Sequence, residues 1–369
     1  MIAPWAKEEL VTADLGDVRL DARFELVLDA LGKRPNLSIP ASCGGRAEMT
    51  AAYRFFDNDA VTFDKVLQPH IDRTMQRLRE QKVALLVQDT TEADLTRPEM
   101  VVVGVGELDG ARRGFLLHET QAFNPEGTPL GTVWAEILNR TEGVSHAPTT
   151  EKHHKNKHTP IEAKESMRWL TGLRKARGVA EQLPGVLCVS VGDSEADIYE
   201  LFAEPRGPLH VLIRACQDRA LQEDNGELLR AKVMAAPTLY TAELSIRGRK
   251  ARTAVEERSR RQNRDSRKAS VEVRAATVTF RPPWRFDRVL PEVTVNVVLV
   301  REPNPPPGEP PVEWMLATTL PIDTPDQVRR IVEYYCVRWC IETAHPNSTS
   351  SGRWCGHGAV GYHSCVGVA

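Results

Sequence analysis

The chain has 369 residues, 41% of them hydrophobic and 27% charged, with a formal net charge of −2. This composition is typical of a globular protein of roughly two or three domains, and it excludes a uniformly basic nucleic-acid binder. There is no run of about 18 apolar residues and no basic-then-apolar leader, so we expect neither a membrane span nor a secretion signal. The seven cysteines are dispersed and odd in number, which is typical of a cytoplasmic protein.

Residues 1–78 predict a small all-α domain. Apolar residues recur at helical spacing, a break follows at 35–40, a second helix begins near Glu48, and a third spans about 62–81. Basic and aromatic residues alternate in the second helix: Arg46, Tyr53, Arg54, Phe55 and Phe56. Two interpretations remain open, a helical bundle with a solvated face or a DNA-docking module, since phosphate contacts need Lys and Arg on one helical face.

Residues 83–91 predict a short buried strand that ends in polar residues. Five apolar residues precede Gln88-Asp89-Thr90-Thr91, so Asp89 is expected at the exposed edge of a sheet. Ligands bind at such edges in open α/β sheets. The alternative is an aspartate that only starts a turn.

Two further strands, 115–123 and 128–138, flank a Pro-Glu-Gly turn at 125–127 and predict an antiparallel start to the sheet together with the Asp89 strand. A helix is expected from Glu162 to about Arg177.

A second strand, 186–193, also ends on an aspartate, Asp193. Ser194 is predicted to cap the helix that follows, which makes Glu195 and Asp197 capping and dipole residues rather than catalytic ones. The next strand, 210–214, ends at Arg214.

Residues 221–320 predict a β-rich region with strands at 239–246, 270–280, 293–300 and 314–319. Between the first two strands, residues 247–268 carry ten Lys or Arg and three Asp or Glu. A charge run of this kind is either a solvated loop or a contact to nucleic-acid phosphates.

The last helix of the pattern begins with Thr324 as cap, Pro325 at its first position and Gln327 completing a capping box. The expected buried stripe is Val328, Ile331, Val332, Tyr335 and Trp339. Tyr335, Arg338 and Glu342 are spaced i, i+3, i+7 and are predicted to share one side of the helix.

Asp89, Asp193 and Glu342 form a candidate three-carboxylate set. Mg²⁺ is usually held by one or two carboxylates plus substrate phosphate. Two such ions, roughly 3.5–4 Å apart, can activate an attacking water or hydroxyl and stabilise the leaving oxygen of a phosphodiester. Arg338 and Tyr335 would be placed to grip a phosphate beside the metals.

Several motifs, in this order along the chain, resemble those of one family. They are Leu15-Gly16-Asp17-x-Arg19, Ala51-Ala52-Tyr53-Arg54-Phe55-Phe56, Gln88-Asp89-Thr90-Thr91, Asp193-Ser194-Glu195-Ala196-Asp197-Ile198-Tyr199-Glu200, Arg267-Lys268-Ala269 and Tyr335-x-x-Arg338-x-x-x-Glu342. Over about residues 1–345 the chain resembles the bacterial insertion-sequence transposases of the IS-four group, which use a DDE triad on a ribonuclease-H-like fold.

The resemblance implies an α/β fold, in which a ribonuclease-H-like mixed sheet carries a β-rich insertion and follows a small all-α domain. The expected parts are a DNA-end-binding domain (1–78), the first part of the catalytic domain (79–220), the insertion (221–320), the last catalytic helix (321–342) and a disordered tail (343–369).

The resemblance also implies roles for individual residues. Asp89, Asp193 and Glu342 would bind two Mg²⁺ or Mn²⁺ ions. DNA contacts are expected from Tyr335, Arg338, Arg214, Trp314, Arg54, Arg267 and Lys268. Trp314 has two interpretations, a core side chain or a platform that stacks a flipped base. The partners would be double-stranded DNA at transposon ends and at the target, bound by a homodimer in the bacterial nucleoid.

The chain departs from the family pattern at two places. Ser194 stands where the family often has Arg, and Thr349 stands where the family has Lys seven residues past the glutamate. Residues 343–369 contain no Lys, Asp or Glu, which predicts a truncated or frameshifted reading that lacks the family's dimerisation segment.

Three functions are therefore weighed. The first is a DNA transposase that cleaves and joins phosphodiesters at insertion-sequence ends, impaired by loss of the C-terminal region. The second is a catalytically inactive DNA-binding remnant. The third is a non-transposing ribonuclease-H-like nuclease, which would cut without regard to terminal repeats.

Overall fold

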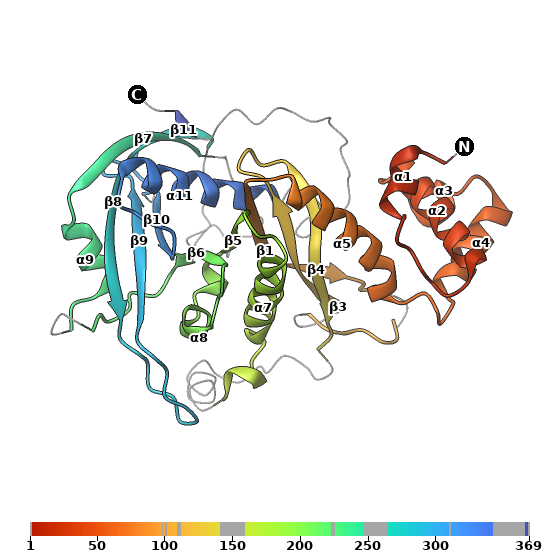
Figure 1. Cartoon of the computed structure of the whole chain (residues 1–369), viewed down its shortest axis with the longest axis horizontal. Helices are drawn as coiled ribbons and strands as arrows, with labels where there is room; N and C mark the ends of the chain where they lie inside the picture. The colour runs from red at the N-terminus through yellow and green to blue at the C-terminus, as the bar shows by residue number, and fades with distance from the viewer. Residues whose placement is uncertain are drawn as a thin grey trace.

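A computed structural model describes residues 2–97, 99, 102–108, 112–140, 159–222, 226–246, 265–309, 311–341 and 366–367. A group of N-terminal helices stands beside a large sheet that carries helices on both faces (Figure 1). This confirms the predicted α/β class with helices preceding a mixed sheet.

The N-terminal group contains four helices around a small core. They are α1 (Pro4–Glu9), α2 (Val18–Lys33), α3 (Ile39–Ser42) and α4 (Arg46–Phe56). Asp17 caps α2 by accepting a hydrogen bond from the Arg19 backbone N–H. Phe24 and Phe55 stack at a centroid distance of 5.6 Å in the centre of this core.

The helix α5 (Phe63–Arg79) joins this group to the sheet. Val66, near its start, packs against the N-terminal core, whereas Met75 and Leu78 belong to the core beneath the sheet. Because one helix serves both cores, the domain boundary at residue 78 stays a prediction.

Eleven strands of the described residues form one sheet in the order β11-β7-β8-β9-β10-β6-β5-β1-β3-β2, with β4 paired to β3. Their bounds are β1 Val83–Asp94, β2 Gly106–Glu107, β3 Arg113–Phe123, β4 Pro129–Leu138, β5 Leu187–Gly192, β6 His210–Ala215, β7 Thr238–Ile246, β8 Arg267–Phe280, β9 Val293–Arg301, β10 Glu313–Thr318 and β11 Val366–Gly367.

The central strands combine two kinds of pairing. β1, β3 and β4 are antiparallel, as the sequence predicts, with Gly127 at φ +82° in their turn. β1, β5 and β6 are parallel to one another. The strands of the predicted β-rich region extend the sheet from β6 through the antiparallel neighbours β10, β9, β8 and β7.

Alternate residues of the central strands enter two separate cores. Leu86 and Cys188 pack on the face covered by α5, α7 (Met167–Glu181), α8 (Tyr199–Ala203) and α9 (Leu229–Ala235). Val87 and Val191 pack on the opposite face, beneath α11 (Pro325–Val337). This double burial explains the continuous apolar run of β1, which is typical of a strand covered on both faces.

The helix α11 starts as the sequence predicts and ends earlier. Both hydrogen bonds of the capping box between Thr324 and Gln327 are present. The α-helix stops at Val337, and a 3₁₀ turn, η3 (Arg338–Cys340), follows. The predicted stripe is buried from Val328 to Tyr335, but Trp339 is only half-buried because it lies in this turn.

Three other sequence predictions are wrong in detail. β1 continues past Asp89 to Asp94, because its antiparallel pairing with β3 extends that far. α7 begins at Met167 rather than at Glu162, after the 3₁₀ turn η1 (Ile161–Ala163). Asp193, and not Ser194 as predicted, caps the 3₁₀ turn η2 (Ser194–Ala196) that follows β5.

Within the described ranges, none of the helices has both the length and the apolar character that a membrane crossing requires.

Candidate active site and nucleic-acid interface

The two strand aspartates lie at equivalent places on neighbouring parallel strands. The last paired residues of β1 and β5 are Val87 and Val191. Asp89 and Asp193 each follow two residues later, and the period-two alternation of strands puts them on the same face as these valines. That is the face covered by α11.

Each carboxylate is anchored by a backbone amide close by in the chain. Asp89 Oδ1 accepts a hydrogen bond from the Thr90 N–H at 2.9 Å. Asp193 Oδ1 accepts one from the Glu195 N–H at 2.8 Å, which makes Asp193 the cap of η2. These bonds fix the direction of both carboxylates.

Three of the residues proposed to contact DNA gather beside Asp193. The ring of Tyr335 is fully buried and lies 5.7 Å from the ring of Trp314, measured between centroids. Arg214 of β6 is paired in register with Leu316 of β10, two residues from Trp314. Burial raises the pKa of the Tyr335 hydroxyl and Asp193 adds to the rise, whereas the cations Arg338 and Arg214 oppose it.

The Tyr335 hydroxyl has no well-aligned hydrogen bond within the described ranges. The polar group placed to hydrogen-bond to it is the guanidinium of Arg214, which helps to hold down the pKa of the hydroxyl. Asp193, Arg214 and Arg338 all lie close enough to affect the pKa of this hydroxyl, so its surroundings carry both signs of charge.

Arg338 lies in η3, and its guanidinium carbon is 4.3 Å from the centroid of the Trp339 ring. Because the α-helix has already ended, the i, i+3, i+7 spacing does not by itself put Tyr335, Arg338 and Glu342 on one side. Glu342 lies outside the described residues. Ile341 directly before it is fully buried in the core beneath α11.

The described part of the chain contains no group of three His, Cys, Asp or Glu side chains placed to hold a metal ion. Asp89 and Asp193 supply two carboxylates on adjacent strands of one face. One or two carboxylates plus substrate phosphate is the donor set that Mg²⁺ and Mn²⁺ accept. The residues present therefore fit a hard divalent cation.

Arg267 and Lys268 are already engaged in ion pairs at the start of β8. Arg267 donates to Glu302 and to Glu309, at 2.5 and 2.6 Å, with 14% of its side chain exposed. Lys268 lies 3.2 Å from Glu243. A DNA contact by Arg267 would have to compete with both carboxylates, and its role in binding stays a prediction. Of the basic stretch before them, residues 247–264 lie outside the described residues.

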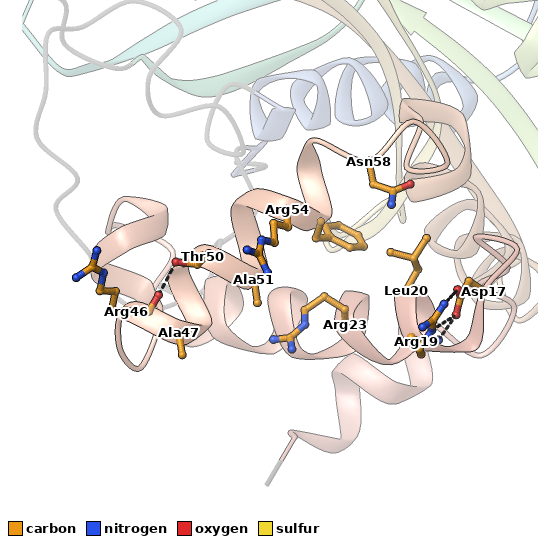
Figure 2. Close-up of a pocket in the computed structure, with 11 residues that line it drawn as sticks. Asp17, Arg19, Leu20, Arg23, Arg46, Ala47, Thr50, Ala51, Arg54 and Asn58 are labelled. Atoms are coloured by element: carbon orange, nitrogen blue, oxygen red, sulfur yellow. Dashed lines mark hydrogen bonds and ion pairs between the residues drawn. The ribbon is translucent and has the colours of Figure 1, made fainter.

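An open pocket of about 970 Å³ lies between α2 and α4 in the N-terminal group (Figure 2). Four arginines line it: Arg19, Arg23, Arg46 and Arg54. Arg54 projects into the pocket from α4, and Arg23 projects into it from α2 (Figure 2). The sequence analysis predicts a DNA contact for Arg54 but does not name Arg23. The signal for Arg23 was its spacing of four residues from Arg19, which places both on one helical face.

The pocket concentrates the positive charge of a segment that is acidic as a whole. Residues 2–61 contain seven Lys or Arg and ten Asp or Glu. Arg19 pairs with Asp17 and Arg23 pairs with Glu48. Arg46 and Arg54 have no carboxylate partner within the described ranges. Unpaired, exposed guanidinium groups are available for the phosphate oxygens of a nucleic acid.

The carboxylate of Glu9 links α1 to α5 and, through α5, to the sheet. Burial raises the pKa of Glu9, but hydrogen bonds from His70 and Arg77 of α5 outweigh it and hold the pKa below its ordinary value. His70 Nε2 accepts a hydrogen bond from the Thr132 N–H at 2.8 Å, so Nδ1 carries the proton that is donated to Glu9. Arg77 also donates to the Leu130 carbonyl oxygen on β4.

Residues 2–61 match the sequence model of a family described as transposase DNA-binding. The match covers α1 to α4 with the whole arginine pocket and ends before α5. The N-terminal helices of this chain are therefore a transposase DNA-binding domain.

Proposed function

We propose that this chain is a DNA transposase that cleaves and joins phosphodiesters at insertion-sequence ends by two-metal-ion DDE chemistry. The observation that carries the proposal is the placement of Asp89 and Asp193. They stand at equivalent positions of adjacent parallel strands, on one face, in a chain that begins with a transposase DNA-binding domain. The central strand arrangement β4-β3-β1-β5-β6, antiparallel and then parallel, supports a ribonuclease-H-like catalytic domain.

Asp89 and Asp193, together with Glu342, would hold the divalent ions. When bound, such ions lower the pKa of an attacking water or hydroxyl and stabilise the leaving oxygen. Asp193 Oδ2 accepts no hydrogen bond within the described ranges and is open to a cation. Cleavage would free a 3′-hydroxyl, which then attacks the opposite strand or the target DNA.

The cations beside Asp193 would orient the scissile phosphate. Arg214 and Arg338 lie close enough to Tyr335 to affect its pKa, so a phosphate at the buried hydroxyl would meet two guanidinium groups. Guanidinium groups bind phosphate through paired, directional N–H donors. Trp314, packed against Tyr335, keeps this wall of the site apolar.

The arginine pocket would bind the phosphates of the transposon end. Glu9, through Arg77 and His70, fixes the orientation of this domain with respect to β4 and hence to the Asp89 strand. Two ends must be brought together for transposition, and the family does so as a homodimer, but residues 343–369 do not resemble the family's dimerisation segment.

The test is Mg²⁺-dependent nicking of DNA that carries the terminal repeats flanking the encoding gene, by the purified full-length chain. We expect a nick at the repeat boundary, and we expect Asp89→Asn and Asp193→Asn to abolish it while binding in a mobility-shift assay persists. Asp94→Asn is the matched control, because Asp94 lies on the same strand but pairs with Arg112 at 3.7 Å.

The outcomes separate the rivals. End-specific binding without nicking indicates an inactive DNA-binding remnant. Nicking that ignores the repeats indicates a non-transposing nuclease. Nicking that survives Asp89→Asn overturns the assignment of the carboxylates.

A further inference from the structure

A buried polar chain runs through the sheet on the face opposite to α11. Gln88 of β1 donates from Nε2 to Ser190 Oγ of β5 at 2.9 Å, and His118 Nε2 lies 3.3 Å from Gln88 Oε1. His118 Nδ1 lies 2.8 Å from Thr90 Oγ1. Gln88, Ser190 and His118 are at most 1% exposed.

The donors of this chain point in one direction. Gln88 donates from Nε2 to Ser190, and its Oε1 can only accept, so His118 carries its proton on Nε2 and donates it to Gln88. Nδ1 of the ring then accepts from the Thr90 hydroxyl, whose oxygen accepts from Arg168 Nε–H at 3.0 Å. Burial, with the nearby charge of Arg168, lowers the pKa of His118 to about 3, so the ring is neutral, as this order requires.

Arg168 of α7 uses its guanidinium in three directions. Nε donates to Thr90 Oγ1, Nη2 donates to Glu195 Oε2 at 2.7 Å, and Nη1 donates to the Glu165 carbonyl oxygen at 3.0 Å. Only 11% of its side chain is exposed. Thr90 and Glu195 belong to two segments that are far apart in the sequence, and Arg168 connects them.

The two residues that Arg168 grips are the two whose backbone amides anchor the aspartates. The Thr90 N–H donates to Asp89 Oδ1, and the Glu195 N–H donates to Asp193 Oδ1. A shift of either residue therefore moves a carboxylate. Arg168 itself stands on a helix that is fixed by the buried Trp169 and by other apolar side chains of the core.

We propose that Arg168 is a positioning residue that sets the separation of the Asp89 and Asp193 carboxylates by clamping Thr90 and Glu195 from the opposite face of the sheet. That this separation serves to bind metal ions rests on the proposed function. Its structural part rests only on the hydrogen bonds. Lys in this place would keep the charge but could reach only one of the partners, because an ammonium is a single point on a flexible stem.

The test uses Mn²⁺ binding, measured by electron paramagnetic resonance on the full-length chain without DNA. We expect Arg168→Met to weaken Mn²⁺ binding about 10- to 100-fold, the usual loss when a group that orients a metal ligand is removed. Arg168→Lys should fall between wild type and Arg168→Met. The Mn²⁺ binding that is lost in Asp89→Asn and Asp193→Asn is the binding that belongs to this site.

Arg174→Met is the matched control. Arg174 also lies on α7 and forms a two-point ion pair, with Glu204, at 2.7 and 3.1 Å, but neither residue touches the aspartate segments. Its loss should leave Mn²⁺ affinity within about twofold. Circular dichroism melting without metal reports the folded fraction of each variant. If Arg168→Met does not fold, Arg168→Lys is the variant whose Mn²⁺ affinity tests the proposal.

Nicking at increasing Mg²⁺ gives the second measurement. The proposal predicts that Arg168→Lys needs more Mg²⁺ for half-maximal nicking and recovers part of its rate at high Mg²⁺, whereas a purely structural defect would not respond to Mg²⁺. Unchanged Mn²⁺ affinity in both folded Arg168 variants overturns the inference, as does a wild type that binds no Mn²⁺. Mn²⁺ binding that depends on Arg168, in a chain that does not nick, overturns the proposed function alone.

Discussion

Arginine side chains have opposite surroundings in the N-terminal helices and in the sheet region. In the N-terminal pocket, Arg46 and Arg54 have no carboxylate partner within the described ranges, and 87% of the Arg19 side chain is exposed. In the sheet region, Arg168 is 11% exposed with three acceptors, and Arg219 is 9% exposed against Asp197. Arg46 and Arg54 are therefore open to a partner, whereas Arg168 and Arg219 are engaged by acceptors within the protein.

The difference agrees with the roles that we propose for the two regions. Attraction between guanidinium groups and a phosphate backbone is long-ranged and tolerates mobile side chains. Carboxylates that share a cation must be held in place by neighbours whose own positions are fixed. We therefore expect substitutions in the pocket to change DNA affinity and leave stability unaltered, and substitutions around the sheet to change stability.

The largest effect is expected for Asp197→Ala. Asp197 accepts hydrogen bonds from Arg219 at 2.6 Å and from the backbone N–H groups of Cys216 and Gln217 at 2.8 Å. Removing one partner leaves a buried charge uncompensated, which costs about 3–5 kcal/mol. Urea unfolding measures the loss. Glu313→Ala, which breaks an exposed pair with Arg230, should cost less than about 1 kcal/mol. Equal losses in the two variants would remove the distinction.

A smaller loss is expected for Gly172→Ala on α7. A methyl group there would lie 2.2 Å from Gln88 Oε1, so Gln88 would have to leave its place between His118 and Ser190. Forcing extra volume into such a site costs typically about 1–3 kcal/mol. Gly178→Ala, on the same helix with open space around it, should be neutral or stabilising by up to about 1 kcal/mol. A tolerated Gly172→Ala would show that the polar chain is not tightly packed.

The neutral state of His118 predicts a pH effect. Its folded pKa, about 3, lies below the ordinary value of 6.5, because burial and Arg168 disfavour the charged ring. The unfolded chain thus binds more protons, and stability falls as pH drops below 6.5, by at most about 1.4 kcal/mol per pH unit. Between pH 6.5 and 5, unfolding free energies of wild type should show this slope, and those of His118→Phe should not. An identical slope in both would place the titrating group elsewhere.

The smallest effect on stability, within about 0.5 kcal/mol, is expected for Arg46→Gln and Arg54→Gln. End-DNA affinity should fall, and the slope of log affinity against log salt should decrease by about 0.9 for each phosphate that the variant no longer binds. Binding measured at several salt concentrations tests this. Lys7→Gln is the control, because Lys7 is exposed on α1 outside the pocket. A variant with weaker affinity and an unchanged salt slope would indicate a role other than phosphate binding.

Much of the local structure could be read from the sequence. The sequence predicts four features that the structure contains: the start of β1, the turn at Gly127, the strands of the 221–320 region and the capping box at Thr324. Each depends on residues within a few positions of one another. The strand ends were less accurate, because β1 stops where β3 ceases to pair with it.

The candidate site divides in the same way. Asp89 and Asp193 could be named from the polar residues after two apolar runs. The role of Asp193 as a cap, in place of Ser194, depended on the path of the chain after β5. The ion pairs of Arg267 could not be foreseen either, since Glu302 is 35 residues away.

The sequence by itself determined which segments are strands, where α11 begins and which carboxylates are candidates, because periodicity and capping are short-range effects. Only the tertiary structure decided that Asp89 and Asp193 share a face and that Arg168 clamps the residues beside them. Those facts depend on strand order and register, through which residues 78 positions apart come within hydrogen-bond distance.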